Sequence, residues 1–235
     1  MKADYTAAAE FYELVADRQV RVSGPPLTTA LSTVDPSTGP VVEIGAGTGR
    51  ITEVISAALP DTRVLAAEPC PSMRAVLTSR VFTDPGLRDR VTVVADSVNT
   101  LALPEQISAV VLFGVVNHLP PAERVDLLRR LGARMPETGP IVVELMGGRY
   151  ARRIPRARIL RESIGELTYE WWAGAEAVAE CLLRWRTVWK VFAGEELVRV
   201  VRDEYEWATV GLDELAEEAG LRCRLLGPEI GVFTR

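Results

Sequence analysis

The chain has 235 residues, with 27 Lys or Arg against 32 Asp or Glu, which gives a net charge of −5. This length accommodates one α/β domain with an insertion, or at most two small domains, and it suffices to bury a sizeable core. The acidic balance argues against a general nucleic-acid-binding surface, because binding to a phosphate backbone relies on clustered Lys and Arg. We therefore expect a small-molecule partner.

Cysteine usage and hydropathy indicate the compartment. The three cysteines are too few and too scattered for a zinc site or a disulfide framework, and their odd number fits a reducing environment. The first residues lack the basic and apolar regions of a signal peptide, and no window approaches the roughly 18 apolar residues of a membrane span. These features predict a cytoplasmic protein with no membrane partner.

Helical and strand patterns alternate along the first part of the chain. A helix is predicted over 7–21, where the Gly-Pro-Pro segment 24–26 would end it, and a second helix over 27–34. Apolar strands are then expected at 41–44, 63–67, 91–95, 109–113 and 141–145. Helices are expected between them at 51–59, 72–79 and 122–135. Short apolar strands separated by helices predict an α/β fold with a parallel sheet buried on both faces.

The pattern changes after Gly147 and Gly148. Long strands are expected at 168–172, 179–191 and 197–207, with residues 193–196 as the hairpin turn between the last two. A helix at 212–219 and strands near 221–226 and 231–233 complete the chain. We predict an antiparallel β cap inserted after the fifth core strand.

The most informative motif follows the first of the core strands. Glu43 precedes three glycines at alternate positions, Gly45, Gly47 and Gly49. Glycines allow the backbone N–H groups of a strand-to-helix turn to approach a ligand closely. The dinucleotide fingerprint G-x-G-x-x-G would require a glycine where Arg50 stands, so the spacing weakens a pyrophosphate-binding interpretation. The segment resembles motif I of the class I S-adenosylmethionine-dependent methyltransferases, E/D-x-G-x-G-x-G.

The resemblance implies a Rossmann-like class I methyltransferase sheet, with S-adenosyl-L-methionine as cofactor, S-adenosyl-L-homocysteine as product, and no metal. It divides the chain into an N-terminal helical lid (1–36), a cofactor-binding core (37–147), an antiparallel β cap (148–210), and a C-terminal helix and strands that complete the core (211–235). The match covers residues 5–145 well. The cap resembles that of many bacterial small-molecule methyltransferases only in its layout.

Further acidic residues end the next strands. Glu68 follows the second strand, where an acidic side chain can accept hydrogen bonds from both ribose hydroxyls, and in the resembling family this residue binds the ribose. Asp96 and Ser97 follow the third strand, where the family contacts the adenine, although Asp-Ser is also an ordinary turn signal. Glu43 is expected to organise the loop and to meet the methionine amino group. The implied cofactor site comprises Tyr12, Glu43, Gly45, Ala46, Gly47, Gly49, Glu68, Pro69, Met73, Asp96, Ser97 and Phe113.

Two residues are candidate catalytic bases. His118, the only histidine, follows the fourth strand, where the family's acceptor site opens. Its near-neutral titration suits a general base, but many methyltransferases carry a histidine at this turn only to support the loop. Glu144 ends the fifth strand among apolar neighbours, so its carboxylate needs a partner, and it is either a base or a ligand for a substrate cation.

Aromatic residues gather in the N-terminal segment and in the cap, which contains all five tryptophans. The resembling enzymes often fold an N-terminal segment over the cofactor, and aromatic walls in the cap would hold a flat substrate. Packing is the alternative throughout, because alternation along a strand is also typical of a sheet against a core. The candidate substrate residues are Tyr5, Phe11, Asn117, Tyr169, Trp171 and Trp185.

One stretch of the chain is basic and follows the fifth strand directly. Its arginines either recognise a carboxylate or phosphate on the substrate, or belong to a solvated loop or a dimer contact. They are Arg149, Arg152, Arg153, Arg156, Arg158 and Arg161.

We predict an enzyme that transfers the methyl group of S-adenosylmethionine to an O, N or C atom of a small aromatic or amino-acid-derived metabolite in specialised metabolism. The reaction is expected to be an in-line displacement with His118 or Glu144 as base. The alternatives are an inactive cofactor-binding module, a nucleic-acid methyltransferase and a nicotinamide-dependent oxidoreductase. A homodimer through the cap is one expected assembly.

Overall fold

The computed structural model describes residues 5–146 and 148–235, and its core is a seven-stranded sheet. The order is β10-β11-β5-β4-β1-β2-β3; strands β1 to β5 are parallel, and β11 runs antiparallel to both β5 and β10. The strands are β1 (Val41–Ile44), β2 (Val64–Ala67), β3 (Val91–Val94), β4 (Ala109–Phe113), β5 (Ile141–Glu144), β10 (Arg222–Leu225) and β11 (Ile230–Thr234). Because β1 pairs with β2 on one side and β4 on the other, the strand order reverses here. Open α/β sheets bind ligands at the carboxyl ends of the strands at such a point.

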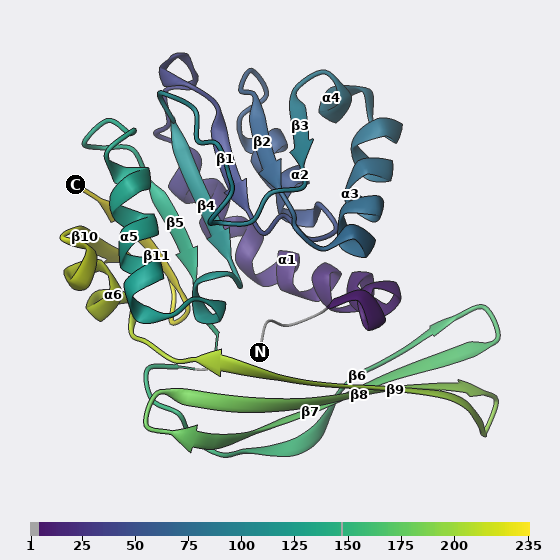
Figure 1. Ribbon diagram of the computed structural model, residues 1–235. Coiled ribbons are helices and arrows are strands. Elements are labelled where there is room, and N and C mark those ends of the chain that lie inside the picture. Colours follow the sequence, from purple (N-terminus) through teal and green to yellow (C-terminus); the bar gives the residue numbers. More distant parts are fainter. Residues whose placement is uncertain (1–4, 147) are drawn as a thin grey trace.

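Helices cover both faces of this sheet (Figure 1). They are α1 (Ala9–Leu31), α2 (Arg50–Ala58), α3 (Pro71–Thr83), α4 (Pro85–Arg88), α5 (Pro121–Gly132) and α6 (Leu212–Ala219), with short 3-10 turns η1 (Tyr5–Ala7), η2 (Pro36–Thr38) and η3 (Val116–His118). Val42 of β1 belongs to a buried cluster with α5 and α6, whereas its neighbour Val41 packs with α1, α2 and α3. The predicted burial of the sheet on both faces is therefore confirmed. Within the described ranges, no helix is both long and apolar enough to cross a membrane.

The first helix differs from the prediction. We expected the Gly-Pro-Pro segment 24–26 to separate two helices, but α1 continues through it. The prediction was wrong because residues on both sides of the segment, such as Ala16 and Leu27, are buried, and tertiary packing stabilises the whole helix. The prolines remove the N–H groups that would bond to the carbonyls of Arg21 and Val22. Both of these residues are exposed, so water can satisfy the carbonyls.

The segment between β5 and α6 forms a second sheet, which we call the cap. Its four antiparallel strands follow the order β6-β7-β8-β9. They are β6 (Ile154–Ile164), β7 (Leu167–Ala179), β8 (Leu182–Ala193) and β9 (Glu196–Ala208). The predicted antiparallel insertion after the fifth core strand is confirmed, as is the turn between β8 and β9. Figure 1 shows the cap as a separate layer, with the first part of α1 between it and the core.

The basic stretch is largely a strand and not the expected loop. Arg156, Arg158 and Arg161 lie in β6, which pairs only with β7 and forms one edge of the cap. Only Leu160 is buried within β6, so the sequence lacks the apolar alternation by which a strand is recognised. Arginines on such an edge also discourage pairing with another chain. The strand expected over 179–191 was likewise wrong in extent, because a turn at residues 180–181 separates β7 from β8.

Candidate active site

The glycine turn between β1 and α2 adopts a backbone that only glycine enters readily. Gly45, Gly47 and Gly49 have φ angles of 75°, 57° and 91°, all in the left-handed region. A Cβ atom on Gly45 would lie 2.4 Å from Cγ2 of Val115, and one on Gly49 would lie 2.7 Å from Cδ1 of Leu77. The turn therefore brings bare backbone to the carboxyl end of the central strand.

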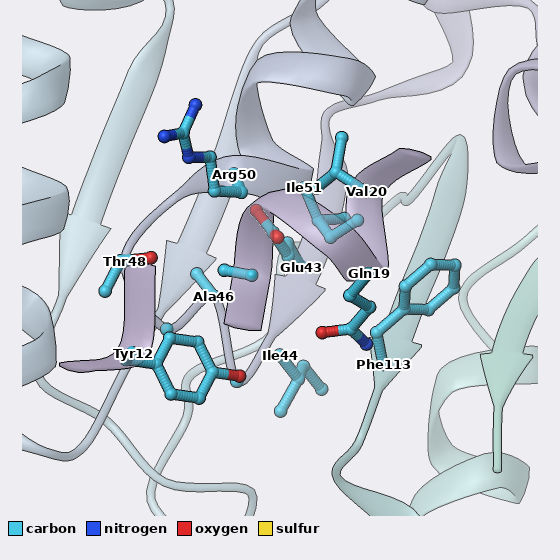
Figure 2. A pocket seen from close by; sticks show the side chains of 13 residues that line it. Tyr12, Gln19, Val20, Glu43, Ile44, Ala46, Thr48, Arg50, Ile51 and Phe113 are labelled. Atoms are coloured by element: carbon cyan, nitrogen blue, oxygen red, sulfur yellow. The ribbon is translucent and has the colours of Figure 1, made fainter. Parts of the chain in front are cut away.

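A cavity opens on this turn and is closed on one side by α1. Figure 2 shows Tyr12 and Gln19 of α1, Glu43 of β1 and Phe113 of β4 around it. Of the predicted cofactor residues, those that line the cavity are Tyr12, Glu43, Gly45, Ala46, Gly47 and Phe113. Gln19 and Arg50 also line it and were not predicted, although Arg50 directly follows the glycine motif and could have been inferred from that position.

Glu43 carries a carboxyl group that is almost completely buried, with 2% of the residue exposed. It accepts a hydrogen bond of 2.6 Å from Oγ1 of Thr52, in the first turns of α2. Burial raises its pKa to about 8, and the hydrogen bond from Thr52 only partly opposes this effect. A cation in the cavity would favour the ionised form, so the site is suited to a positively charged ligand.

Glu68 links the end of β2 to the glycine turn. Its two carboxylate oxygens accept hydrogen bonds of 2.8 Å from the backbone N–H groups of Gly47 and Cys70. Burial raises the pKa of Glu68, and these hydrogen bonds oppose the rise. The structure thus brings Glu68 and the glycine motif together, as predicted, although they lie far apart in sequence.

The remaining predicted cofactor residues, Gly49 and Glu68 included, are not among the residues that line the cavity. Met73 is buried in the first turn of α3, and Pro69 is exposed just before that helix. Asp96 and Ser97 are half-buried after β3, where Ser97 donates its backbone N–H to Oγ1 of Thr100. Their roles in adenine binding stay predictions.

His118 lies in η3, after β4, and is paired with the N-terminal segment. Its Nε2 is 2.8 Å from the hydroxyl oxygen of Tyr5. The imidazole packs edge-on against Trp207 of the cap, with ring centroids 4.5 Å apart, and lies 6.3 Å from Tyr205. Burial lowers the pKa of His118 to about 4, so the ring is neutral at pH 7.

Tyr5 and Tyr205 lie beside this histidine, and Tyr12 lies beside Tyr5. Tyr5 of η1 lies 6.3 Å from Tyr12 of α1 and 6.4 Å from Tyr205 of β9, measured between ring centroids. Burial is the main cause that raises the pKa of each, to about 12 for Tyr12, where the charge of Glu68 adds to the effect. All three hydroxyls are therefore neutral hydrogen-bonding groups. Together with His118 and Trp207 they form an aromatic enclosure that joins the lid, the core and the cap.

Glu144, the second candidate base, is engaged by α1. Its carboxylate accepts hydrogen bonds from Nε2 of Gln19 and from Oγ of Ser23. Burial raises its pKa, and these two hydrogen bonds oppose the rise. Both oxygens thus contribute to holding α1 on the sheet, which satisfies the requirement for a partner that the sequence indicated.

Most of the predicted substrate aromatics pack against one another. Phe11 is fully buried and stacks on Trp189 with centroids 4.8 Å apart and an interplanar angle of 13°. Trp171 also stacks on Trp189, with ring centroids 5.6 Å apart, and Tyr169 contacts Phe11 edge-on. These residues form the interface between α1 and the cap, as the packing alternative predicted.

Asn117 and Trp185 lie nearer to His118. Asn117 is buried, and its Nδ2 donates a 2.7 Å hydrogen bond to the carbonyl of Ala208, which ties η3 to the end of β9. Trp185 pairs directly with Tyr205 across β8 and β9. Tyr205 and Trp207 were not among the residues selected from the sequence, because their position beside His118 depends on how the cap docks.

Comparison with known proteins agrees with this geometry. Residues 41–139 match the family model described as a methyltransferase domain. No curated protein sequence matches the chain. The chain has the fold of DesVI from Streptomyces venezuelae, with a TM-score of 0.77 at 15% identity over 100% of this chain and 99% of that one.

Two further solved structures share the fold. CalS10 from Micromonospora echinaspora is described as an amino pentose methyltransferase with bound S-adenosylmethionine, involved in calicheamicin biosynthesis; its TM-score is 0.73 at 20% identity, over 91% of this chain and 90% of that chain. KedS8 from Streptoalloteichus sp. is described as a sugar N-methyltransferase; its TM-score is 0.63 at 15% identity, over 99% of this chain and 88% of that chain.

Residues 41–139 are thus a methyltransferase domain, set in a mostly parallel sheet with an antiparallel cap.

Proposed function

We propose that this protein is a methyltransferase that uses S-adenosylmethionine and acts on the amino nitrogen of a small, sugar-like acceptor in the synthesis of a specialised metabolite. CalS10 and KedS8, named as amino pentose and sugar N-methyltransferases, share its fold over most of both chains. The observation that carries the proposal is the half-buried contact between Tyr5 and a neutral His118 inside the aromatic enclosure. This proposal replaces the aromatic or amino-acid-derived acceptor that the sequence suggested.

The cavity residues fit S-adenosylmethionine. The glycine turn presents bare backbone, and the buried carboxyl of Glu43 would meet the methionine ammonium, whose charge favours ionisation of that carboxyl. Glu68 would exchange its hydrogen bonds to Gly47 and Cys70 for ribose hydroxyls. When bound, S-adenosylmethionine supplies a methyl group on a positively charged sulfur, which keeps the electrons of the broken C–S bond as the acceptor's lone pair binds the carbon.

The protonation state of His118 favours nitrogen as the methylated atom. An alkyl hydroxyl is a very weak acid, so its activation requires a strong base, and burial makes His118 a weak one. An amine needs only to lose its ammonium proton, which a neutral imidazole or water can accept. Within the described part of the chain, the hydrogen bonds to the His118 ring include Tyr5 but no carboxylate that would strengthen it as a base.

Lid and cap would exclude water from the reaction, which strengthens electrostatic interactions in the site. The lid is held on the core near the cofactor turn, because Oε2 of Glu13 accepts hydrogen bonds of 2.8 Å from Arg50 and 2.7 Å from Arg80. In this proposal residues 1–36 close the site, 37–147 hold the cofactor, 148–210 contact the acceptor, and 211–235 complete the sheet.

The test is a methyl-transfer assay with S-adenosylmethionine and matched acceptors. We would use methyl glycosides of a 4-amino pentose and a 3-amino hexose, with their hydroxy counterparts as controls. We expect equal amounts of S-adenosylhomocysteine and N-methyl glycoside by mass spectrometry from the amino compounds. Methylation of the hydroxy compounds alone would overturn the proposal.

His118→Ala gives a second readout of the same proposal. We expect kcat for an amino glycoside to fall about 100-fold at pH 7, the low end of general-base effects, because the base is weak. The loss should shrink as the pH approaches the pKa of the amine, since water then suffices to deprotonate it. A loss that does not change with pH would contradict the role of proton acceptor.

A further inference from the structure

The cap contributes a carboxylate to the inner side of the proposed acceptor site. Asp203 lies in β9 between Val201 and Tyr205, and alternate residues of a strand project from the same face. This face is the inner one, because Tyr205 lies 6.3 Å from His118 and Val201 packs against the cluster that contains Phe11. Asp203 is half-buried there.

Its neighbours in the cap are mostly apolar. Strand register places Thr187 of β8 opposite Asp203, between the pair of Trp185 with Tyr205 and the pair of Trp189 with Val201. Thr187 is buried. Asp203 and Thr187 are therefore the polar members of a row of otherwise aromatic and apolar residues.

The charge of Asp203 acts on two tyrosines of the aromatic enclosure. Burial raises the pKa of Tyr5 and of Tyr205 most, and the charge of Asp203 raises both further. This effect agrees with the position of Asp203, two residues from Tyr205 on the same face of β9. Tyr5 is also the hydrogen-bond partner of His118.

Two acidic residues on the outer face of β9 form ion pairs with arginines of β8. Glu204 and Glu206 form ion pairs of 2.7 Å with Arg186 and 2.9 Å with Arg184 on the neighbouring strand. Asp203 is distinguished from them by its place on the face that meets the lid and η3.

We infer that Asp203, with Thr187 beside it, is the residue that makes the enzyme select an amino over a hydroxyl acceptor. This inference rests on the proposed N-methylation. A carboxylate attracts an ammonium group into a partly dry site. After the ammonium loses a proton to His118 or water, the lone pair of the neutral amine attacks the methyl carbon as the C–S bond breaks. Positive charge then develops on the nitrogen, and a fixed negative charge stabilises that transition state more than the neutral amine. A hydroxyl that loses its proton during transfer gains less.

The experiment compares Asp203→Asn with Glu204→Gln, an acid-to-amide change at the next residue on the opposite face. For each protein we would measure kcat/KM for the amino glycosides and for their hydroxy counterparts, and the affinity for S-adenosylhomocysteine by calorimetry. We expect Asp203→Asn to lower the amino-to-hydroxy ratio about 10- to 100-fold, as expected for loss of a charged hydrogen bond, with cofactor affinity unchanged. Glu204→Gln should match the wild type.

An unchanged ratio in Asp203→Asn, with amino glycosides still methylated, would overturn the inference and leave the proposed function intact. Wild-type activity on hydroxy glycosides alone would instead overturn the proposed function. If no glycoside is turned over, calorimetric binding to the S-adenosylhomocysteine complex replaces the rate ratio. Preferential binding of the amino compound that Asp203→Asn abolishes would support the inference, and binding of neither compound would overturn both proposals.

Discussion

Phe11→Ala separates packing from substrate binding at the interface between α1 and the cap. Phe11 has no exposed surface, stacks on Trp189, and lies beneath the guanidinium of Arg199 at 5.6 Å. Removal of a buried phenylalanine side chain costs about 3–5 kcal/mol, partly as lost transfer free energy and partly as a cavity. This is a large fraction of the about 5–15 kcal/mol by which domains are stable.

The assay is urea unfolding followed by tryptophan fluorescence, because all five tryptophans lie in the cap. We expect the variant to unfold at a much lower urea concentration, while Phe11→Leu loses about 1–2 kcal/mol because most of the volume is retained. A matched exposed site is Phe82→Ala, which should change stability by less than about 0.5 kcal/mol. A Phe11→Ala protein with wild-type stability and a raised KM for the acceptor would refute the packing role.

Three other perturbations test separate parts of the site. Gly45→Ala should cost about 1–2 kcal/mol in backbone strain and weaken cofactor binding at least about 10-fold, because its Cβ would meet Val115 and φ is 75°; calorimetry that finds wild-type affinity would contradict this. Tyr5→Phe should lower kcat about 3- to 10-fold through loss of the hydrogen bond to His118, with unchanged affinity for S-adenosylhomocysteine; an unchanged kcat would show that the hydroxyl is dispensable. The folded-state pKa of His118 is about 4, below its ordinary 6.5, so its contribution to stability is complete above pH 6.5 and is lost as the pH falls toward 4. In His118→Gln the unfolding free energy should therefore depend less steeply on pH over this range. A pH dependence equal to that of the wild type would contradict burial of His118 as a neutral ring.

The core and the cofactor turn were predictable because local sequence determines them. Strands such as Val41–Ile44 are continuous apolar runs, and parallel strands place their carboxyl ends at one edge. This rule predicts that Glu68 lies at the glycine turn, and in the structure its carboxylate accepts a hydrogen bond from the backbone N–H of Gly47. Tyr5 and His118 were each selected from sequence, but their direct contact depends on how the N-terminal segment folds back.

Features that depend on tertiary packing were not predictable. The Gly-Pro-Pro segment 24–26 has the local composition of a helix end, and only burial on both sides keeps α1 continuous. In β6 the pairing with β7 decides the structure, while its exposed arginines give no periodic signal. Asp203 was overlooked for the same reason, since only the docking of the cap turns its face of β9 toward the lid and η3.

The most direct test of the account is calorimetric titration of the wild-type protein and of Glu68→Ala with S-adenosylmethionine, S-adenosylhomocysteine and, as a control, NADH. We expect saturable binding of both sulfur nucleosides and no binding of NADH. The affinities should be at least about 10-fold weaker in the variant, because the buried, hydrogen-bonded carboxylate of Glu68 is lost. Binding of NADH, or of neither sulfur nucleoside, would contradict the account.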